Sequence, residues 1–140
     1  MRSRIVKSFS PLKALVLCAA VAFASGAFAA DLSPQSSQAD GVAIRVKPTD
    51  VSPGASSWQF QVTLDTHSGS LDDDLAKTAV LVDRAGKRYV AVSWQGDPAG
   101  GHHRSGVLRF KALSPRPDAI EMRIQRSGEA APRSFRWQLK

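Results

Sequence analysis

A period-two alternation of apolar and polar side chains is the feature of this sequence that most restricts its fold. The alternation occupies these segments after Gly41: 42–46, 58–64, 90–94, 120–124 and 135–139. Alternation of this kind predicts a strand with one face in a hydrophobic core and the other in water. Two shorter apolar runs, at 78–83 and 107–111, predict two further strands. We therefore expect seven strands.

Turn-forming residues separate the expected strands. Pro53 and Gly54 lie between the first two, and residues 83–86 predict a tight hairpin turn between the third and fourth. Helical character is confined to residues 71–77. Seven short strands in about a hundred residues predict an all-β fold, a seven-stranded antiparallel immunoglobulin-like β-sandwich over residues 41–140. Inward positions of that sandwich would hold the tryptophans Trp58, Trp94 and Trp137.

Residues 1–29 have the three-part pattern of a secretory signal peptide. Basic residues come first, an apolar stretch at 14–23 follows, and the Ala-Phe-Ala sequence at 27–29 is a cleavage signal. The apolar stretch is too short to cross a bilayer as a stable helix. We therefore expect cleavage before Ala30, a periplasmic or secreted mature protein, and no stable membrane span after cleavage.

The single cysteine, Cys18, lies within this leader. A lipoprotein is the alternative interpretation, but lipid modification needs a small residue before the cysteine, and Leu17 stands there. The mature chain then has no cysteine, which excludes disulfides, thiolate metal sites and cysteine nucleophiles.

Charge gives little indication of a nucleic-acid partner. The whole chain has a net charge of +7, and the leader holds four basic residues and no acidic one, which leaves +3 for the mature domain. The pattern contains no basic stripe, so we expect no nucleic-acid binding. The segment 30–40 is polar and too poor in apolar side chains to offset the entropy of ordering. We expect it to form a flexible polar tail.

Three histidines lie outside the alternating pattern. His67 follows the second expected strand, and His102 and His103 precede the fifth, in segments rich in glycine and polar residues. Loops after the second, fourth and sixth strands would emerge at one end of the sandwich. In an immunoglobulin-like order the second strand also pairs with the fifth. We therefore expect the three histidines to gather at one end.

Three imidazoles with a carboxylate are a ligand set that suits Cu or Zn. The first hypothesis is accordingly a transition-metal site formed by His67, His102, His103 and Asp65. Adjacent residues of an extended chain point to opposite faces, so His102 and His103 bind one ion only if the chain bends near Gly101.

The alternative is a hydrogen-bonded knot that serves an envelope structural or protein-interaction domain. In it, the side chains of residues 65–68 would cap turns, with His67 bridging the two loops, and Arg104 would pair with Asp65 or Asp97. Under either hypothesis we expect no enzyme. Serine, histidine and aspartate are present, but the sequence has no G-x-S-x-G nucleophile motif. The expected partner is a metal ion or an envelope protein.

Two motifs carry a resemblance to other proteins. The DTHS sequence at 65–68 and the GGHHR-x-GVL-x-F sequence at 100–110 resemble those of a group of small exported bacterial proteins. The likeness extends over most of the mature domain, and the GGHHR stretch is its most specific part. The resemblance implies a compact immunoglobulin-like domain in the cell envelope and implies no particular activity.

Overall fold

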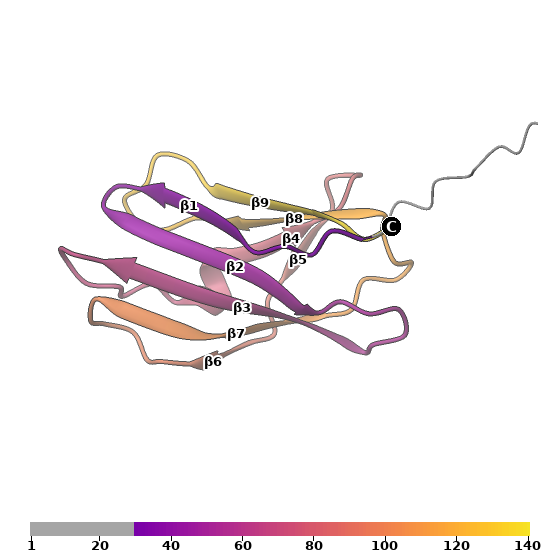
Figure 1. Ribbon diagram of the computed structural model, residues 1–140, viewed down its shortest axis with the longest axis horizontal. Coiled ribbons are helices and arrows are strands. Elements are labelled where there is room, and N and C mark those ends of the chain that lie inside the picture. The colour runs from indigo at the N-terminus through magenta and orange to yellow at the C-terminus, as the bar shows by residue number, and fades with distance from the viewer. Residues whose placement is uncertain (1–29) are drawn as a thin grey trace, which may run out of the picture.

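The computed structural model describes residues 30–140, which form two antiparallel sheets packed face to face (Figure 1). One sheet contains, in spatial order, β1 (Gln35–Ala39), β2 (Val42–Asp50), β3 (Ser57–Thr66), β7 (His103–Lys111) and β6 (Ser93–Gly96). The other contains β5 (Arg88–Val90), β4 (Ala79–Val82), β8 (Ala119–Ile124) and β9 (Arg133–Gln138). The all-β prediction is confirmed, with nine strands in these residues rather than seven. The predicted signal peptide, 1–29, lies outside the described residues.

Helix is confined to one short element of the described chain. It is α1 (Leu75–Thr78), a single turn that leads into β4; it overlaps the end of the segment expected to be helical, 71–77, and extends one residue beyond it. Among residues 30–140, no helix has the length and apolar character needed to cross a membrane.

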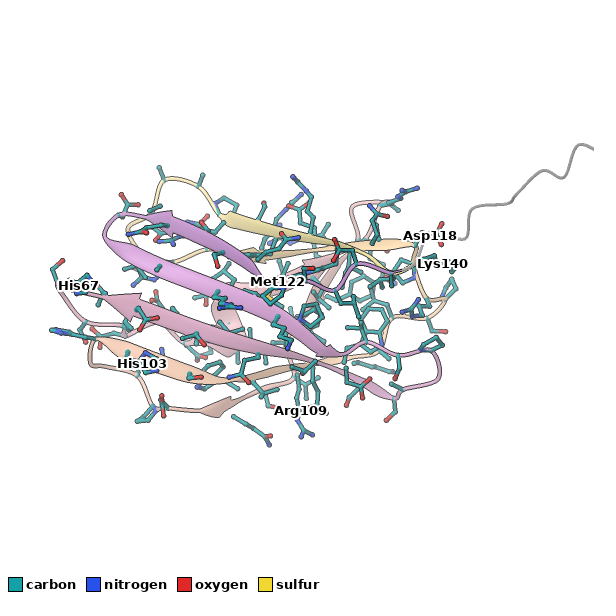
Figure 2. The ribbon with its side chains drawn as sticks, in the orientation of Figure 1. His67, His103, Arg109, Asp118, Met122 and Lys140 are labelled. Atoms are coloured by element: carbon teal, nitrogen blue, oxygen red, sulfur yellow. The ribbon has the colours of Figure 1, made fainter. Side chains whose placement is uncertain are left out.

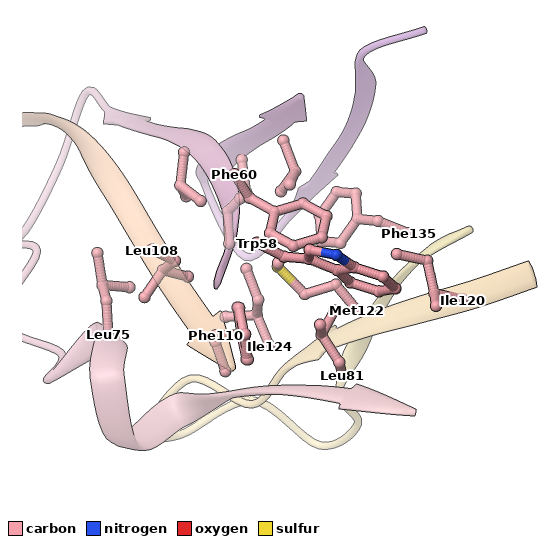
Figure 3. Packing of buried hydrophobic residues seen from close by; sticks show 14 of the residues in the cluster. Trp58, Phe60, Leu75, Leu81, Leu108, Phe110, Ile120, Met122, Ile124 and Phe135 are labelled. Carbon is pink, nitrogen blue, oxygen red and sulfur yellow. The ribbon is translucent and has the colours of Figure 1, made fainter. Parts of the chain in front are cut away.

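The core lies between the two sheets, where the alternating apolar residues meet (Figure 3). Phe60 of β3 is central: its ring packs edge-on against Phe110 and at a tilt against Trp137, with centroids 5.7 Å apart in both pairs. Trp58 and Met122 complete the packing around it. The inward faces predicted from the period of two for 42–46, 58–64, 120–124 and 135–139 are confirmed.

The prediction of a single strand over residues 89–94 is wrong. The chain changes sheets there: β5 pairs with β4, and β6 pairs with β7. Val90 and Val92, which were expected to face inward, lie at this crossing and are 74% and 70% exposed. Trp94 is half-buried, and its indole Nε1 donates to the carbonyl of Asp97. Side-chain alternation reports the exposure of a strand's two faces and contains no information on which sheet the strand joins.

The flexible tail expected over 30–40 is also wrong, because residues 35–39 form the edge strand β1. This polar strand is held by main-chain pairing with β2 and by a side-chain contact, in which the amide of Gln35 bonds to both the backbone N–H and the carbonyl of Arg136. The indole of Trp137 donates to the carbonyl of Ser33 at 2.9 Å. None of these interactions needs an apolar side chain, so composition did not reveal them.

The hairpin between β1 and β2 turns at Asp40 and Gly41, both in the left-handed region with φ of 48° and 74°. Asp-Gly favours this two-residue turn. The guanidinium of Arg133 lies beneath the turn and donates to the carbonyls of Ser37, Ala39 and Val42. A buried cation from the last strand therefore fixes the first hairpin.

Replacing this cation is expected to destabilise the fold strongly. Arg133→Met removes the donor of these three carbonyls and leaves the buried carboxylate of Glu129 with only its 3.4 Å contact to Arg126, since the side chains of Arg133 and Glu129 are only 3% and 5% exposed. We expect a loss of about 3 kcal/mol or more in the free energy of unfolding, measured by urea denaturation. Arg136→Met, at a side chain 72% exposed, is the control and should cost less than about 1 kcal/mol. Equal losses in the two variants would contradict the role assigned to Arg133.

Candidate functional site

The two histidine-bearing loops lie at the same end of the sandwich (Figure 2). β3 and β7 are antiparallel neighbours, with Asp65 opposite His103, so the end of one strand adjoins the start of the other. The expected pairing of the second strand with the fifth is confirmed. We call residues 65–74 and 97–104 the histidine end; Asp118 and the C-terminal Lys140 lie at the opposite end.

Main-chain hydrogen bonds join the two loops directly. The N–H of Thr66 donates to the carbonyl of His102 at 2.9 Å. The N–H of Leu71 donates to the carbonyl of Gly101, and the carbonyl of Leu71 accepts from the N–H of Gly100, both at 3.0 Å. Gly100 and Gly101 have φ of 111° and 71°, which bends the chain sharply before β7. Because other residues rarely adopt this backbone, the two glycines are what allow the loop carbonyls to face the first loop.

Arg104 fills the space beneath these loops. Its side chain is 2% exposed, and its Nη1 donates to the carbonyls of Leu71 and Asp73 at 3.0 and 2.7 Å. The guanidinium also lies 5.5 Å from the ring centroid of Trp94. Arg104 was expected to pair with a carboxylate of Asp65 or Asp97; this is wrong, because its position on the inward face of β7 directs it to loop carbonyls that have no strand partner.

A second buried network continues across the same end toward β9. The carboxylate of Asp73 accepts from the Nε of Arg126 at 2.8 Å and from the N–H of Ser127. Arg126 also contacts Glu129, whose carboxylate binds Arg133. The hydrogen bond from Arg133 holds the pKa of Glu129 below its usual value. Asp73 therefore connects the histidine end to the arginine beneath the first hairpin.

Arg104 was expected in the hydrogen-bonded knot with a different partner, and Arg126 and Arg133 were not expected to have a structural role. The sequence signal was their position in the alternating pattern: Arg104 and Arg133 occupy inward positions of β7 and β9, where the neighbouring inward residues are apolar. A cation at a core position is almost never fully buried unless it is paired, so its occurrence there indicates a partner from another segment.

Asp65 and His103 form an ion pair on the outer surface of the histidine end. The Nδ1 of His103 lies 2.5 Å from Oδ1 of Asp65, and the two side chains are 60% and 58% exposed. The hydrogen bond and the negative charge of Asp65 raise the pKa of His103, and Asp97 adds to this effect. With Nδ1 directed at the carboxylate, Nε2 is the nitrogen that remains for an external ligand.

Of the four residues proposed as metal ligands, the structure brings Asp65 and His103 into contact and leaves His67 and His102 exposed. Within residues 30–140, no three His, Cys, Asp or Glu side chains are grouped so as to hold a metal ion. His102 lies in the bend that precedes β7, and His103 is the first residue of that strand. The two loops are bridged by backbone hydrogen bonds rather than by His67. Of the expected side-chain caps, Thr66 alone forms one: its hydroxyl accepts from the N–H of Ser68 at 3.2 Å.

Comparison with known proteins gives a distant structural neighbour. Neither the family models nor the curated proteins searched contain a match to this chain. A crystal structure of a DUF4426 family protein from Pseudomonas aeruginosa is similar at 12% sequence identity and a TM-score of 0.45, over 74% of this chain and 91% of that one. At this level the likeness carries no argument about function.

The Asp65–His103 pair predicts a specific pH dependence. We expect an NMR titration to place the pKa of His103 above its ordinary value of 6.5, and Asp65→Asn to lower it. Because the folded pKa exceeds the unfolded one, the pair's contribution to stability is fully present below about pH 6.5 and is lost as pH rises through the folded pKa. Asp72→Asn, at a carboxylate that bonds Ser70 instead, should leave the titration of His103 in place. An unchanged His103 pKa in Asp65→Asn would refute the pairing.

Proposed function

We propose that this chain is an exported, non-enzymatic binding module whose histidine end contacts a protein of the cell envelope. Support comes from the rigidity of that end: the two loops are joined by main-chain bonds, and Arg104 binds the carbonyls of Leu71 and Asp73 from below. A surface that is ordered before binding loses less conformational entropy when a partner arrives. The exposed polar residues of the histidine end are thus held in place by buried interactions.

We further infer that the fold is immunoglobulin-like. The strand orders β2-β3-β7-β6 and β5-β4-β8-β9 match the A-B-E-D and C′-C-F-G orders of such domains, with β1 as an added edge strand. Domains of this architecture commonly bind through the loops at one end of the sandwich. Export is supported by the signal-peptide pattern of residues 1–29.

Site-specific cross-linking in the producing bacterium tests the protein-partner hypothesis. A photo-reactive amino acid is placed at His67 or His102, both exposed at the histidine end, and in a control at Arg84, an exposed residue of the turn between β4 and β5. We expect one discrete cross-linked product from both histidine positions and none from Arg84, detected by a shift in mass on immunoblots. The absence of a product, or the same product from Arg84, would reject the histidine end as the interaction surface.

Metal binding is a second candidate, favoured by the Asp65–His103 geometry. A carboxylate that bonds one imidazole nitrogen orients the ring and increases the basicity of the other nitrogen toward a metal. His103 would accordingly present Nε2 to Cu or Zn, and His67 or His102 would complete the ligand set after side-chain rotation.

Calorimetric titration with Cu(II) and Zn(II) distinguishes this candidate. We expect saturable binding that His103→Ala abolishes and that Asp65→Asn weakens roughly tenfold, because Asp65 only orients the ring. Asp72→Asn is the matched control and should bind as the wild type does. His67→Ala and His102→Ala identify the further ligand. Binding that is not saturable, or that is indifferent to His103→Ala, would eliminate the metal site.

A further inference from the structure

The outer surface of the five-stranded sheet gathers basic side chains that are far apart in the sequence. Arg45 and Lys47 face outward from β2, while Arg109 and Lys111 face outward from β7, with β3 between them. Arg45, Lys47 and Lys111 are exposed and Arg109 is half-buried. Figure 2 shows the side chain of Arg109 projecting away from the sandwich. We call the outward surface of β2, β3 and β7 the basic face.

Counter-charges are missing from the middle of this face. The acidic residues in its strands are Asp50 and Asp65, which lie at opposite ends of the sheet. Both are already engaged, Asp50 by the backbone and hydroxyl of Ser52 and Asp65 by His103. Within the described chain, none of the four cations forms a salt bridge. The buried Nε of Arg109 also has no hydrogen-bond partner there.

On the outer surface of the four-stranded sheet, two cations are paired with a carboxylate. Glu121 lies at the centre of its outer surface and binds Arg123 at 2.8 Å and Arg136 at 3.3 Å. The hydrogen bond from Arg123 lowers the pKa of Glu121 to about 2, so this carboxylate stays ionised at any physiological pH. Arg123 and Arg136 of this sheet therefore share an internal carboxylate, while the four cations of the basic face have none and are available to an external anion.

Neutral hydrogen-bonding side chains occupy the strip between the cations. Gln59, Gln61 and Thr63 of β3 lie between the basic residues of β2 and β7, and Gln61 donates to the hydroxyl of Ser105 at 2.9 Å. Adjacent strands are about 4.8 Å apart, so β2 and β7 lie about 10 Å apart across this strip. The two rows of cations are offset along it, since Lys47 pairs with Gln61 and Arg109 pairs with Gln59. Amides and hydroxyls both donate and accept hydrogen bonds, which matches a ligand that carries hydroxyl groups.

Two other polyanions fit this surface less well. The face has no aromatic side chain on which nucleic-acid bases could stack. It also lacks large exposed apolar residues that could enter a lipid bilayer; among the described residues these are Val90 and Val92, at the crossing between the sheets. A flat array of cations and amides without apolar anchors favours a hydrophilic chain that combines acidic groups with hydroxyls.

We propose that the basic face binds an acidic polysaccharide. Arg45, Lys47, Arg109 and Lys111 contact its carboxylate or sulfate groups, and the glutamines of β3 hydrogen-bond its hydroxyls. This surface meets the histidine end at Asp65 and His103, but its four cations are different residues, so the module has two adjoining binding surfaces on one scaffold. The inference stands or falls independently of any partner at the histidine end.

The test is a titration of polygalacturonate against protein produced from the full-length coding sequence. We expect binding that weakens as salt is added, because the contacts are exposed ion pairs. Arg45→Gln/Lys47→Gln should weaken it about fivefold to tenfold, as expected for two surface ion pairs. Arg88→Gln/Lys87→Gln removes the same charge from the β4–β5 hairpin and should leave the affinity unchanged. Lys111→Gln, a single substitution at an exposed residue of β7, tests the second row of cations in the same way.

Several outcomes would overturn the proposal. Equal weakening by the two double variants would show attraction by net charge alone, and failure to bind polygalacturonate would remove the inference directly. Tighter binding to phosphatidylglycerol vesicles or to a single-stranded oligodeoxynucleotide at the same salt concentration would assign the face to another ligand. Neutral dextran should not bind. His103→Ala should bind polygalacturonate normally, which separates this result from the tests of the histidine end.

Discussion

Buried guanidinium groups that donate to carbonyls of loops and of the first hairpin are the interaction on which one end of this sandwich depends. Arg104 binds the carbonyls of Leu71 and Asp73, and Arg133 binds three carbonyls of the first hairpin. Strands satisfy one another's main-chain groups, but loops that cover the core have no such partners. Arginine suits this role because its donors diverge in one plane and reach several acceptors at once.

A half-buried arginine has a similar role at the opposite end of the molecule. Arg116 donates to the carbonyls of Val51 and Leu139 at 2.9 Å, linking a loop to the last residues of the chain. At the histidine end the cations are also balanced, through Asp73 and Glu129, so the buried charge is compensated by both carboxylates and carbonyls. Removing one member would leave the others buried and unpaired, which is why such networks make an end rigid.

The scaffold has two different kinds of surface, one formed by loops at an end of the sandwich and one formed by neighbouring strands of a sheet. The histidine end is a compact set of loops, where specificity would come from a few fixed polar groups such as Asp65 and His103. The basic face is flat and repetitive, and there an extended ligand would be held by many weak, salt-sensitive contacts. A net charge of +3 for residues 30–140 gives no indication of this division, because Arg123 and Arg136 on one sheet are paired with a carboxylate and the four cations of the basic face are not.

Local periodicity was sufficient for the β architecture and for most of the core, because burial of one strand face imposes alternation directly on the sequence. The meeting of the two histidine loops was predicted from an assumed strand order, in which the second strand pairs with the fifth. Periodicity was misleading at residues 89–94, where a lateral hydrogen-bonding partner selects the sheet, and composition was misleading at 35–39, where main-chain pairing orders a polar strand. The contacts of Arg104 and Arg133, and the placement of Arg45 and Arg109 on one face of the sheet, exist only once strand register is established. Register joins residues that are distant along the chain, and no local pattern encodes that pairing.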